Sequence, residues 1–234
     1  MDSHTNISAR DSILKSIRDH LAISAPLDAA HRLKIDRVQP NGDLMSFATA
    51  VPAVERSSLI QTFKENLEAV GGHCIVVENV AEATQAVTEI IADVQRTPLL
   101  ARRIALSNSL LVQTVCRGIQ IDVDEMTVSP SRAEIFSYDV GVSAVQYAIA
   151  ETGTLVLESE AERHRLISLV PPAHIAIVEA DKICLTVAEA LAKVNQGNLS
   201  PTVTFITGPS RTADIELTLT IGVHGPQELY VIVI

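Results

Sequence analysis

The polar residues best suited to chemistry are concentrated in two turns near the carboxyl end of the chain, within residues 206–234. The turns interrupt apolar segments and carry hydroxyl, guanidinium, carboxylate and imidazole groups: Thr207, Ser210, Arg211, Asp214, Glu216 and His224. A plain connection needs far fewer polar groups. We therefore predict a site at the strand ends of an α/β sheet, where ligands of such folds usually bind.

The first turn, GPSRT around Ser210, is expected to lie between a strand and a short helix over residues 214–221. Backbone N–H groups at a helix N-terminus favour an anion, and Arg211 offers a bidentate grip on a carboxylate or phosphate. The alternative is that Ser210 only caps the helix, with Asp214 and Glu216 complementing its dipole. Because these two acids would repel an anion, the turn does not predict a simple phosphate cradle.

Further candidates lie in the second turn and earlier in the chain. His224 stands close to two glycines and is a possible acid or base near neutral pH, or a turn residue that bonds local carbonyls. His174 opens an apolar strand, which favours a structural histidine over a substrate contact. Glu151, followed by Thr152 at a glycine corner, is a possible nucleophile, base or hydroxyl ligand, or a partner for turn N–H groups. Arg165, beside two prolines, is placed where it could face the same site.

Helices and strands alternate along the rest of the chain. Helical spacing or capping signals predict helices over residues 9–21, 60–70, 81–94, 110–116, 187–194 and 214–221, and one through Val142, Val145 and Ile149. Apolar runs predict strands at 73–78, 103–106, 119–123, 154–157, 165–169, 174–179 and 202–207, and at the carboxyl end.

This alternation implies crossover connections, so we predict an α/β fold with a mostly parallel sheet and flanking helices. The three closely spaced strands between residues 154 and 179 predict an antiparallel addition, a hairpin or a meander. Residues 1–53 are expected to form an N-terminal helix and an extended arm, and residues 54–234 the α/β domain.

Composition excludes several classes of function. Hydrophobic residues make up 47% of the chain, enough for a sizeable core, and the formal net charge of −10 disfavours nucleic acid and anionic membranes as partners. No apolar run approaches the roughly 20 residues of a membrane span. The three cysteines are isolated, which fits a cytoplasmic protein without a clustered-cysteine metal site. Dinucleotide, phosphate-loop, zinc-protease and hydrolase motifs are absent, so no cofactor or metal is expected in this chain.

Three segments together resemble the lactate-utilisation protein C family, whose shared unit is the LUD domain: AIAETGTLVLES (148–159), RLISLVPPAHIAIVEADKI (165–183) and TFITGPSRTADIELTLTIGVHGPQELYVIVI (204–234). The resemblance runs from about residue 54 onward. It implies a fold like that of ribose-phosphate isomerases, glucosamine-phosphate deaminases and CoA transferases. It also implies a role in oxidising L-lactate to pyruvate beside partner subunits that carry iron–sulfur clusters.

Three hypotheses follow. In the first, a subunit of a lactate-oxidising complex, Arg211 or Arg165 holds the substrate carboxylate and His224 or Glu151 accepts a proton. In the second, a stand-alone transferase or ligase acts on a thioester or phosphorylated molecule, with Glu151 as nucleophile. In the third, the chain is a non-catalytic scaffold. The expected substrate contacts are Thr152, Arg165, His174, Thr207, Ser210, Arg211, Asp214 and Glu216. The prediction requires Arg211, His224 and Glu151 to share one crevice at the carboxyl ends of the strands.

Overall fold

A computed structural model describes most of the α/β region and little of the chain before it. The described residues are 14–16, 56–159, 165–194, 196, 200–215, 218–221 and 225–234, with the backbone alone described at 212–215 and 218–221. Of the expected helix over residues 9–21, residues 14–16 are helical, and its remainder lies outside the described residues. The expected arm up to residue 53 also lies outside them.

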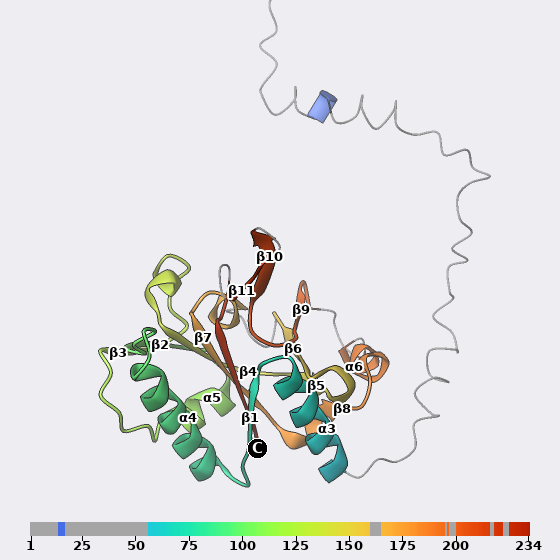
Figure 1. The fold of residues 1–234 in the computed structure, drawn as a ribbon, viewed down its shortest axis with the longest axis horizontal. Helices are drawn as coiled ribbons and strands as arrows, with labels where there is room; N and C mark the ends of the chain where they lie inside the picture. The colour runs from blue at the N-terminus through green and yellow to red at the C-terminus, as the bar shows by residue number, and fades with distance from the viewer. Residues whose placement is uncertain are drawn as a thin grey trace, which may run out of the picture. The chain divides into compact units, whose positions relative to one another are not determined.

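The main sheet consists of six parallel strands in the order β1-β12-β7-β4-β2-β3 (Figure 1). Its strands are β1 (His73–Val76), β2 (Arg103–Leu106), β3 (Glu125–Val128), β4 (Val140–Ala144), β7 (Ala173–Val178) and β12 (Glu228–Val233). All residues of β4 and β7 are buried. Strands buried on both faces are the usual pattern of a parallel sheet covered by helices.

Helices α4 (Val80–Gln95) and α5 (Leu110–Cys116) cover one face of this sheet. Their apolar side chains pack with Ile104, Val142 and Ile175 in one buried cluster. Helix α4 begins at Asn79, whose side chain accepts the N–H of Glu82, as expected for an N-cap. Both helices lie where their periodicity predicts them. No helix among the described residues is long and apolar enough to cross a bilayer.

Helix α3 (Arg56–Ala69) and a second sheet cover the other face. The second sheet has four strands in the order β8-β5-β6-β9, with antiparallel pairs and one parallel pair. These strands are β5 (Tyr147–Ile149), β6 (Thr154–Glu158), β8 (Ile183–Cys184) and β9 (Val203–Ile206). Helix α6 (Val187–Val194) packs on this sheet, and β10 (Arg211–Ile215) and β11 (Thr218–Ile221) form a separate antiparallel hairpin.

The glycine corner after Glu151 is fixed against helix α3. Gly153 has a φ of 61°, and a Cβ there would lie 2.4 Å from the backbone nitrogen of Leu67. Only glycine combines a positive φ with so close an approach. The Asn66 side chain donates to the carbonyl of Ala150, at a distance of 2.8 Å. The 3₁₀ turn η2 (Ala150–Thr152) and the start of β6 are thereby held on α3.

The structure confirms the predicted α/β class with a mostly parallel sheet, flanking helices and an antiparallel addition. Four local predictions are wrong. The helix expected through Val142, Val145 and Ile149 is the strand pair β4 and β5, because a run of buried β-branched residues can show helical spacing by chance. The helix expected over 214–221 is part of the β10–β11 hairpin, where apolar residues alternate with threonines.

The other two errors concern short segments. Residues 165–169, expected as a strand, begin with the 3₁₀ turn η3 (Arg165–Ser168). Residues 119–123, also expected as a strand, form a loop, and the following segment provides β3. The predicted addition is built from other segments as well, because β7 is a central strand of the main sheet and not part of the addition.

Candidate functional site

A hollow of about 340 Å³ lies at the amino-terminal ends of two neighbouring parallel strands, β7 and β12. Its polar lining comes from Ser168, His174, Thr207 and Ser210. Its apolar lining comes from Leu169, Phe205, Ile206, Pro226 and Leu229. Among the lining residues that the structure describes there is no carboxylate, ammonium or guanidinium group. The hollow therefore suits a small molecule held mainly by hydroxyls, backbone groups and one imidazole.

A buried serine–histidine pair joins strands β4 and β7 at the hollow. His174 is fully buried, and its Nε2 lies 2.8 Å from Oγ of Ser143. Its other ring nitrogen, Nδ1, has no hydrogen-bond partner among the described residues. Burial lowers the pKa of His174 to about 3, because a positive charge on the ring would lose its hydration. The imidazole is therefore neutral near pH 7, with one nitrogen that can donate and one that can accept.

Three threonine hydroxyls form a chain that leads away from the hollow. Thr207 Oγ1, at the hollow, lies 2.7 Å from Thr154 Oγ1, which lies 2.7 Å from Thr152 Oγ1. Thr154 is buried at the start of β6, and Thr152 ends the turn η2. The chain connects the predicted glycine corner to the hollow through the side chain of Thr207.

The two carboxyl-terminal turns meet at the hollow, as their polar composition suggested. The Ser210 N–H donates to the carbonyl of Pro226 at 2.8 Å. Gly225 lies against Ser210 so closely that a Cβ at Gly225 would be 3.1 Å from the Ser210 Cβ. The Gln227 N–H, in turn, donates to the carbonyl of Pro172 at 2.7 Å. These backbone contacts hold the turns over the start of β7.

Three predicted residues make their contacts away from the hollow. Oε1 of Glu151 accepts the N–H of Val187 at the start of α6, at 2.7 Å. Nη2 of Arg211 donates to the carbonyl of Val70 at the end of α3, at 2.6 Å. Nη1 of Arg165 lies 3.4 Å from the hydroxyl of Thr202. None of the three lines the hollow, and their catalytic and substrate-binding roles stay predictions.

The remaining predicted residues fall where side chains are not described. Asp214 belongs to strand β10, of which the backbone is described, while Glu216 and His224 lie outside the described residues. The expected crevice shared by Arg211, His224 and Glu151 is therefore described for two members. These two contact different helices, Arg211 at the end of α3 and Glu151 at the start of α6.

The predicted position at the carboxyl ends of the strands is wrong for this hollow. It lies at the amino ends, where His174 and Leu229 are paired as the second residues of β7 and β12. The reason is that an antiparallel hairpin, and not a helix, fills the connection between β9 and β12. The second turn leads directly into β12, and the hydrogen bond from Ser210 to Pro226 holds the first turn beside it, so both lie at the amino end of β12. For the same reason no helix N-terminus follows Ser210.

Sequence reasoning did not single out Ser143 or Ser168, and it included Thr154 in the motif at the glycine corner without giving it a role of its own. Ser143 bonds His174, Thr154 links two other threonines, and Ser168 lines the hollow with its hydroxyl donating to the carbonyl of Arg165. A serine inside the buried run VGVSA was the one signal available for Ser143, since an apolar strand rarely retains a hydroxyl without a partner.

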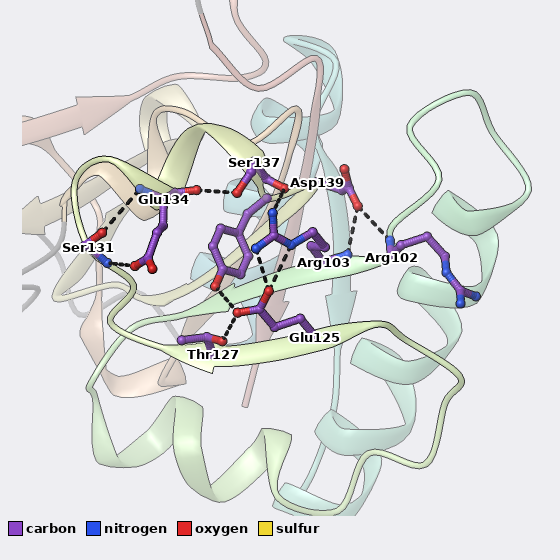
Figure 2. Close-up of polar contacts among 9 residues, drawn as sticks. Arg102, Arg103, Glu125, Thr127, Ser131, Glu134, Ser137 and Asp139 are labelled. Carbon is purple, nitrogen blue, oxygen red and sulfur yellow. Dashed lines mark hydrogen bonds and ion pairs between the residues drawn. The ribbon is translucent and has the colours of Figure 1, made fainter.

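Figure 2 shows a second polar cluster, at the amino ends of β2, β3 and β4. The Arg103 guanidinium donates to Oε2 of Glu125 at 2.6 and 3.0 Å. The hydroxyls of Tyr138 and Thr127 donate to Oε1, at 2.6 and 2.7 Å. These hydrogen bonds, that from Tyr138 first, lower the pKa of Glu125 to about 2.

Asp139 connects the same strands through their backbone. Its Oδ2 accepts the N–H groups of Arg102 and Arg103, both at 2.8 Å, as Figure 2 shows. The charged groups of this cluster are thus bonded to one another and to the backbone at the strand starts. We assign the cluster to the framework and not to ligand binding.

A second hollow, of about 380 Å³, lies between helix α4 and the turn at Gly118. Its lining includes Thr84, Gln85 and Glu89 on the outer side of the helix. The described lining contains no buried polar atom without a partner. The hollow beside His174 is the better candidate because it contains such an atom.

The cysteines are placed as buried side chains. Burial raises the pKa of Cys74 to about 11 and that of Cys116 to about 12, so both are thiols near neutral pH. Burial also raises the pKa of Cys184. Among the described residues, no group of three or more His, Cys, Asp or Glu side chains is arranged to hold a metal ion.

Comparison with known proteins identifies the family. The LUD domain model matches residues 60–234. The lactate utilization protein C of Deinococcus radiodurans is 32% identical, and the match covers 79% of this chain and 84% of that protein. An uncharacterized protein of Neisseria meningitidis is 29% identical, with 97% of this chain and 94% of that protein covered. The chain therefore belongs to the LUD domain family, which confirms the resemblance seen in its motifs.

A solved structure agrees with this assignment. The crystal structure of a DUF162 family protein from Deinococcus radiodurans is similar to this fold, with a TM-score of 0.59. The two sequences are 25% identical, and the superposition covers 77% of this chain and 98% of the other. The α/β architecture is thus shared with an experimentally determined structure.

Proposed function

We propose that this protein acts in lactate utilisation, as a subunit of a complex that oxidises L-lactate to pyruvate, and that the hollow beside His174 binds the 2-hydroxy acid. The proposal draws on the similarity to lactate utilization protein C over most of both chains. The observation that carries it at the site is the neutral, buried imidazole of His174 in a hollow lined by hydroxyl groups. A hollow of about 340 Å³ is at the small end of ligand pockets, which suits a three-carbon acid.

The chemistry requires a partner. Conversion of L-lactate to pyruvate breaks the C–H and O–H bonds at carbon 2 and releases two electrons and two protons. We propose that iron–sulfur clusters on partner subunits accept the electrons. A cluster is usually held by four cysteine ligands, whereas this chain has three scattered cysteines. In this division of labour, the hollow contributes substrate contacts and the partners contribute the redox centres.

The hydroxyl groups of the hollow are assigned to the substrate carboxylate. Thr207 and Ser210 provide them on one turn, and the hydrogen bond from the Ser210 N–H to the carbonyl of Pro226 holds this turn against the second one. Hydroxyl donors can bind a carboxylate without a buried countercharge, although more weakly than a guanidinium would. Arg211 follows directly in sequence, but its guanidinium donates to the carbonyl of Val70 away from the hollow, so the carboxylate is assigned to the hydroxyl groups.

Reconstitution tests the proposal. Lactate-dependent reduction of a dye by the purified iron–sulfur subunits is measured with and without this chain, and with Thr207→Val and Ser129→Ala variants. We expect activity only with the chain, reduced in Thr207→Val and unchanged in Ser129→Ala, whose hydroxyl is buried without a partner away from the hollow. Equal activity without the chain would refute the proposal. Full activity in Thr207→Val would leave a scaffold role as the better account.

A further inference from the structure

We infer that Nδ1 of His174 is the atom that recognises the ligand, by a hydrogen bond to an uncharged hydroxyl or keto oxygen of the molecule in the hollow. The identity of the ligand in this inference rests on the proposed function, whereas the existence of the contact does not. This contact makes His174 and Ser143 one unit, in which the serine hydroxyl bonds Nε2 in either ring tautomer and Nδ1 contacts the ligand.

The unpartnered nitrogen is the first argument. His174 is fully buried and lines the hollow, and its Nδ1 has no partner among the described residues while its Nε2 is bonded to Ser143. Buried polar atoms in native proteins nearly always have a partner, which is a protein group, an ordered water or a ligand. Because His174 lines a hollow of about 340 Å³, a ligand in that hollow is the candidate for the missing partner.

The position of Ser143 is the second argument. A serine hydroxyl can donate or accept, and a neutral imidazole carries one N–H. When Nε2–H donates to Ser143 Oγ, Nδ1 accepts and fits the hydroxyl of a 2-hydroxy acid. When Ser143 donates to Nε2, Nδ1–H donates and fits a keto oxygen. A change of ring tautomer, accompanied by rotation of the Ser143 hydroxyl, therefore lets the same contact hold an alcohol or the corresponding ketone.

The surroundings keep the ring neutral for this purpose. Burial lowers the pKa of His174, and the described lining of the hollow contains no carboxylate that would stabilise an imidazolium. The ring is thus a contact that can exchange donor and acceptor roles near pH 7. The ring is suited to forming a hydrogen bond with an oxygen at carbon 2 and not to becoming protonated.

Affinity for three matched acids provides the first test. L-lactate and pyruvate carry an oxygen at carbon 2, and propionate has the same carbon chain and carboxylate without it. We expect wild-type protein to bind L-lactate and pyruvate about tenfold or more tightly than propionate, as for a buried hydrogen bond lost with its partner. In His174→Gln, whose amide replaces Nε2 and leaves nothing at Nδ1, this preference should fall to near one. In His174→Asn, whose amide lies nearer to Nδ1, part of it should remain.

Nitrogen NMR of ¹⁵N-histidine-labelled wild-type protein provides a second readout that needs no variant to be stable. The His174 Nδ1 signal should change on ligand binding, with the proton on Nε2 in the L-lactate complex and on Nδ1 in the pyruvate complex. The Ser129→Ala protein is the matched control, because it loses a hydroxyl that, like Nδ1 of His174, is buried without a partner but lies outside the hollow.

The outcomes separate the two proposals. If L-lactate and pyruvate bind but the Nδ1 signal is unchanged, or the preference over propionate survives in His174→Gln, the inference is overturned and the proposed function stands. If neither binds, the same spectra are recorded with glycolate, glycerate, 2-oxobutyrate and acetone. A changed Nδ1 signal with any of these supports the inference while the lactate assignment fails. No change with all of them overturns the inference.

Discussion

Lowering the pH from 7 to 5 should destabilise the wild-type protein more than a His174→Gln variant. His174 is fully buried, and burial lowers its pKa from 6.5 to about 3. The unfolded chain therefore binds a proton at this histidine below pH 6.5, whereas the folded protein does not until the pH approaches 3. Stability from this group is complete above pH 6.5 and is lost as the pH falls toward 3.

The size of the effect follows from these two pKa values. At pH 5 the unfolded histidine is almost fully protonated and the folded one is almost fully neutral, so the difference between pH 7 and pH 5 is about 2 kcal/mol. Down to pH 3, where the folded histidine is itself half protonated, the loss would reach about 4 kcal/mol. A glutamine at position 174 does not titrate, and every other group is common to both proteins.

Urea unfolding followed by circular dichroism at pH 7 and pH 5 measures this difference. The wild-type protein should lose about 2 kcal/mol more than the variant over this interval, whatever the variant loses at pH 7. An equal pH dependence in the two proteins would mean that the imidazole is hydrated or charged in the folded state. In that case, the description of His174 as a buried neutral contact would be refuted.

Three further substitutions test how the framework supports the hollow. Gly141→Ala should lower the free energy of unfolding by about 3 kcal/mol, since its Cβ would lie 1.9 Å from the carbonyl oxygen of Ile167 in η3. In the control Gly118→Ala, the Cβ would meet the Thr84 side chain, whose methyl group lies at 3.1 Å. This control should cost less than about 1 kcal/mol in the same urea titration. Asp139→Ala should cost about 2 to 4 kcal/mol because it leaves two backbone N–H groups without their acceptor, and Asp139→Asn should recover most of the loss in thermal melts. Glu151→Ala should lower the free energy of unfolding by about 1 kcal/mol, because it removes the acceptor for the Val187 N–H at the start of α6. Glu151→Gln should lose less stability than Glu151→Ala. An unchanged melting temperature in Glu151→Ala would contradict the capping contact.

The sequence correctly predicted those elements whose local signals, such as periodicity and capping residues, agree with the structure packed around them. Helix α4 has both an amphipathic period and an N-cap at Asn79, and α5 follows a run of small polar residues. The buried strands β2 and β7 appear as short apolar runs. Each of these signals is set by the segment itself, which is why a single sequence was sufficient.

Strands β4 and β5 were wrongly predicted to form a helix, because a segment buried on both faces loses the alternation that distinguishes a strand from a helix. Part of the β10–β11 hairpin was wrongly predicted to be a helix, although the apolar residues of β11 alternate with threonines. Because of this error the two turns were expected at the carboxyl ends of the strands, whereas they lie at the amino end of β12. Pairing with distant segments decides the structure of β4 and β5, whereas the alternation of Leu219 and Ile221 with threonines was a local signal for a strand.

The candidate site was predictable in part. The turns at Ser210 and Gly225 were expected to meet, and they do so through the hydrogen bond between Ser210 and Pro226. The partnership of His174 with Ser143 was not predictable, because residues 31 positions apart become neighbours only when β4 pairs with β7. His174 was read mainly as a structural histidine, and one of its nitrogens is indeed bonded within the core.

The most direct test of the account is isothermal titration of L-lactate and pyruvate into the purified chain, alone and with the iron–sulfur subunits that we propose as its partners. A Thr207→Val, Ser210→Ala double variant, which removes two hydroxyls of the hollow, is titrated in parallel with Ser129→Ala. We expect saturable binding to wild type and to Ser129→Ala, and an affinity lower by about tenfold or more in the double variant. The absence of heat with both ligands in both mixtures, or equal affinity in the double variant, would contradict the account.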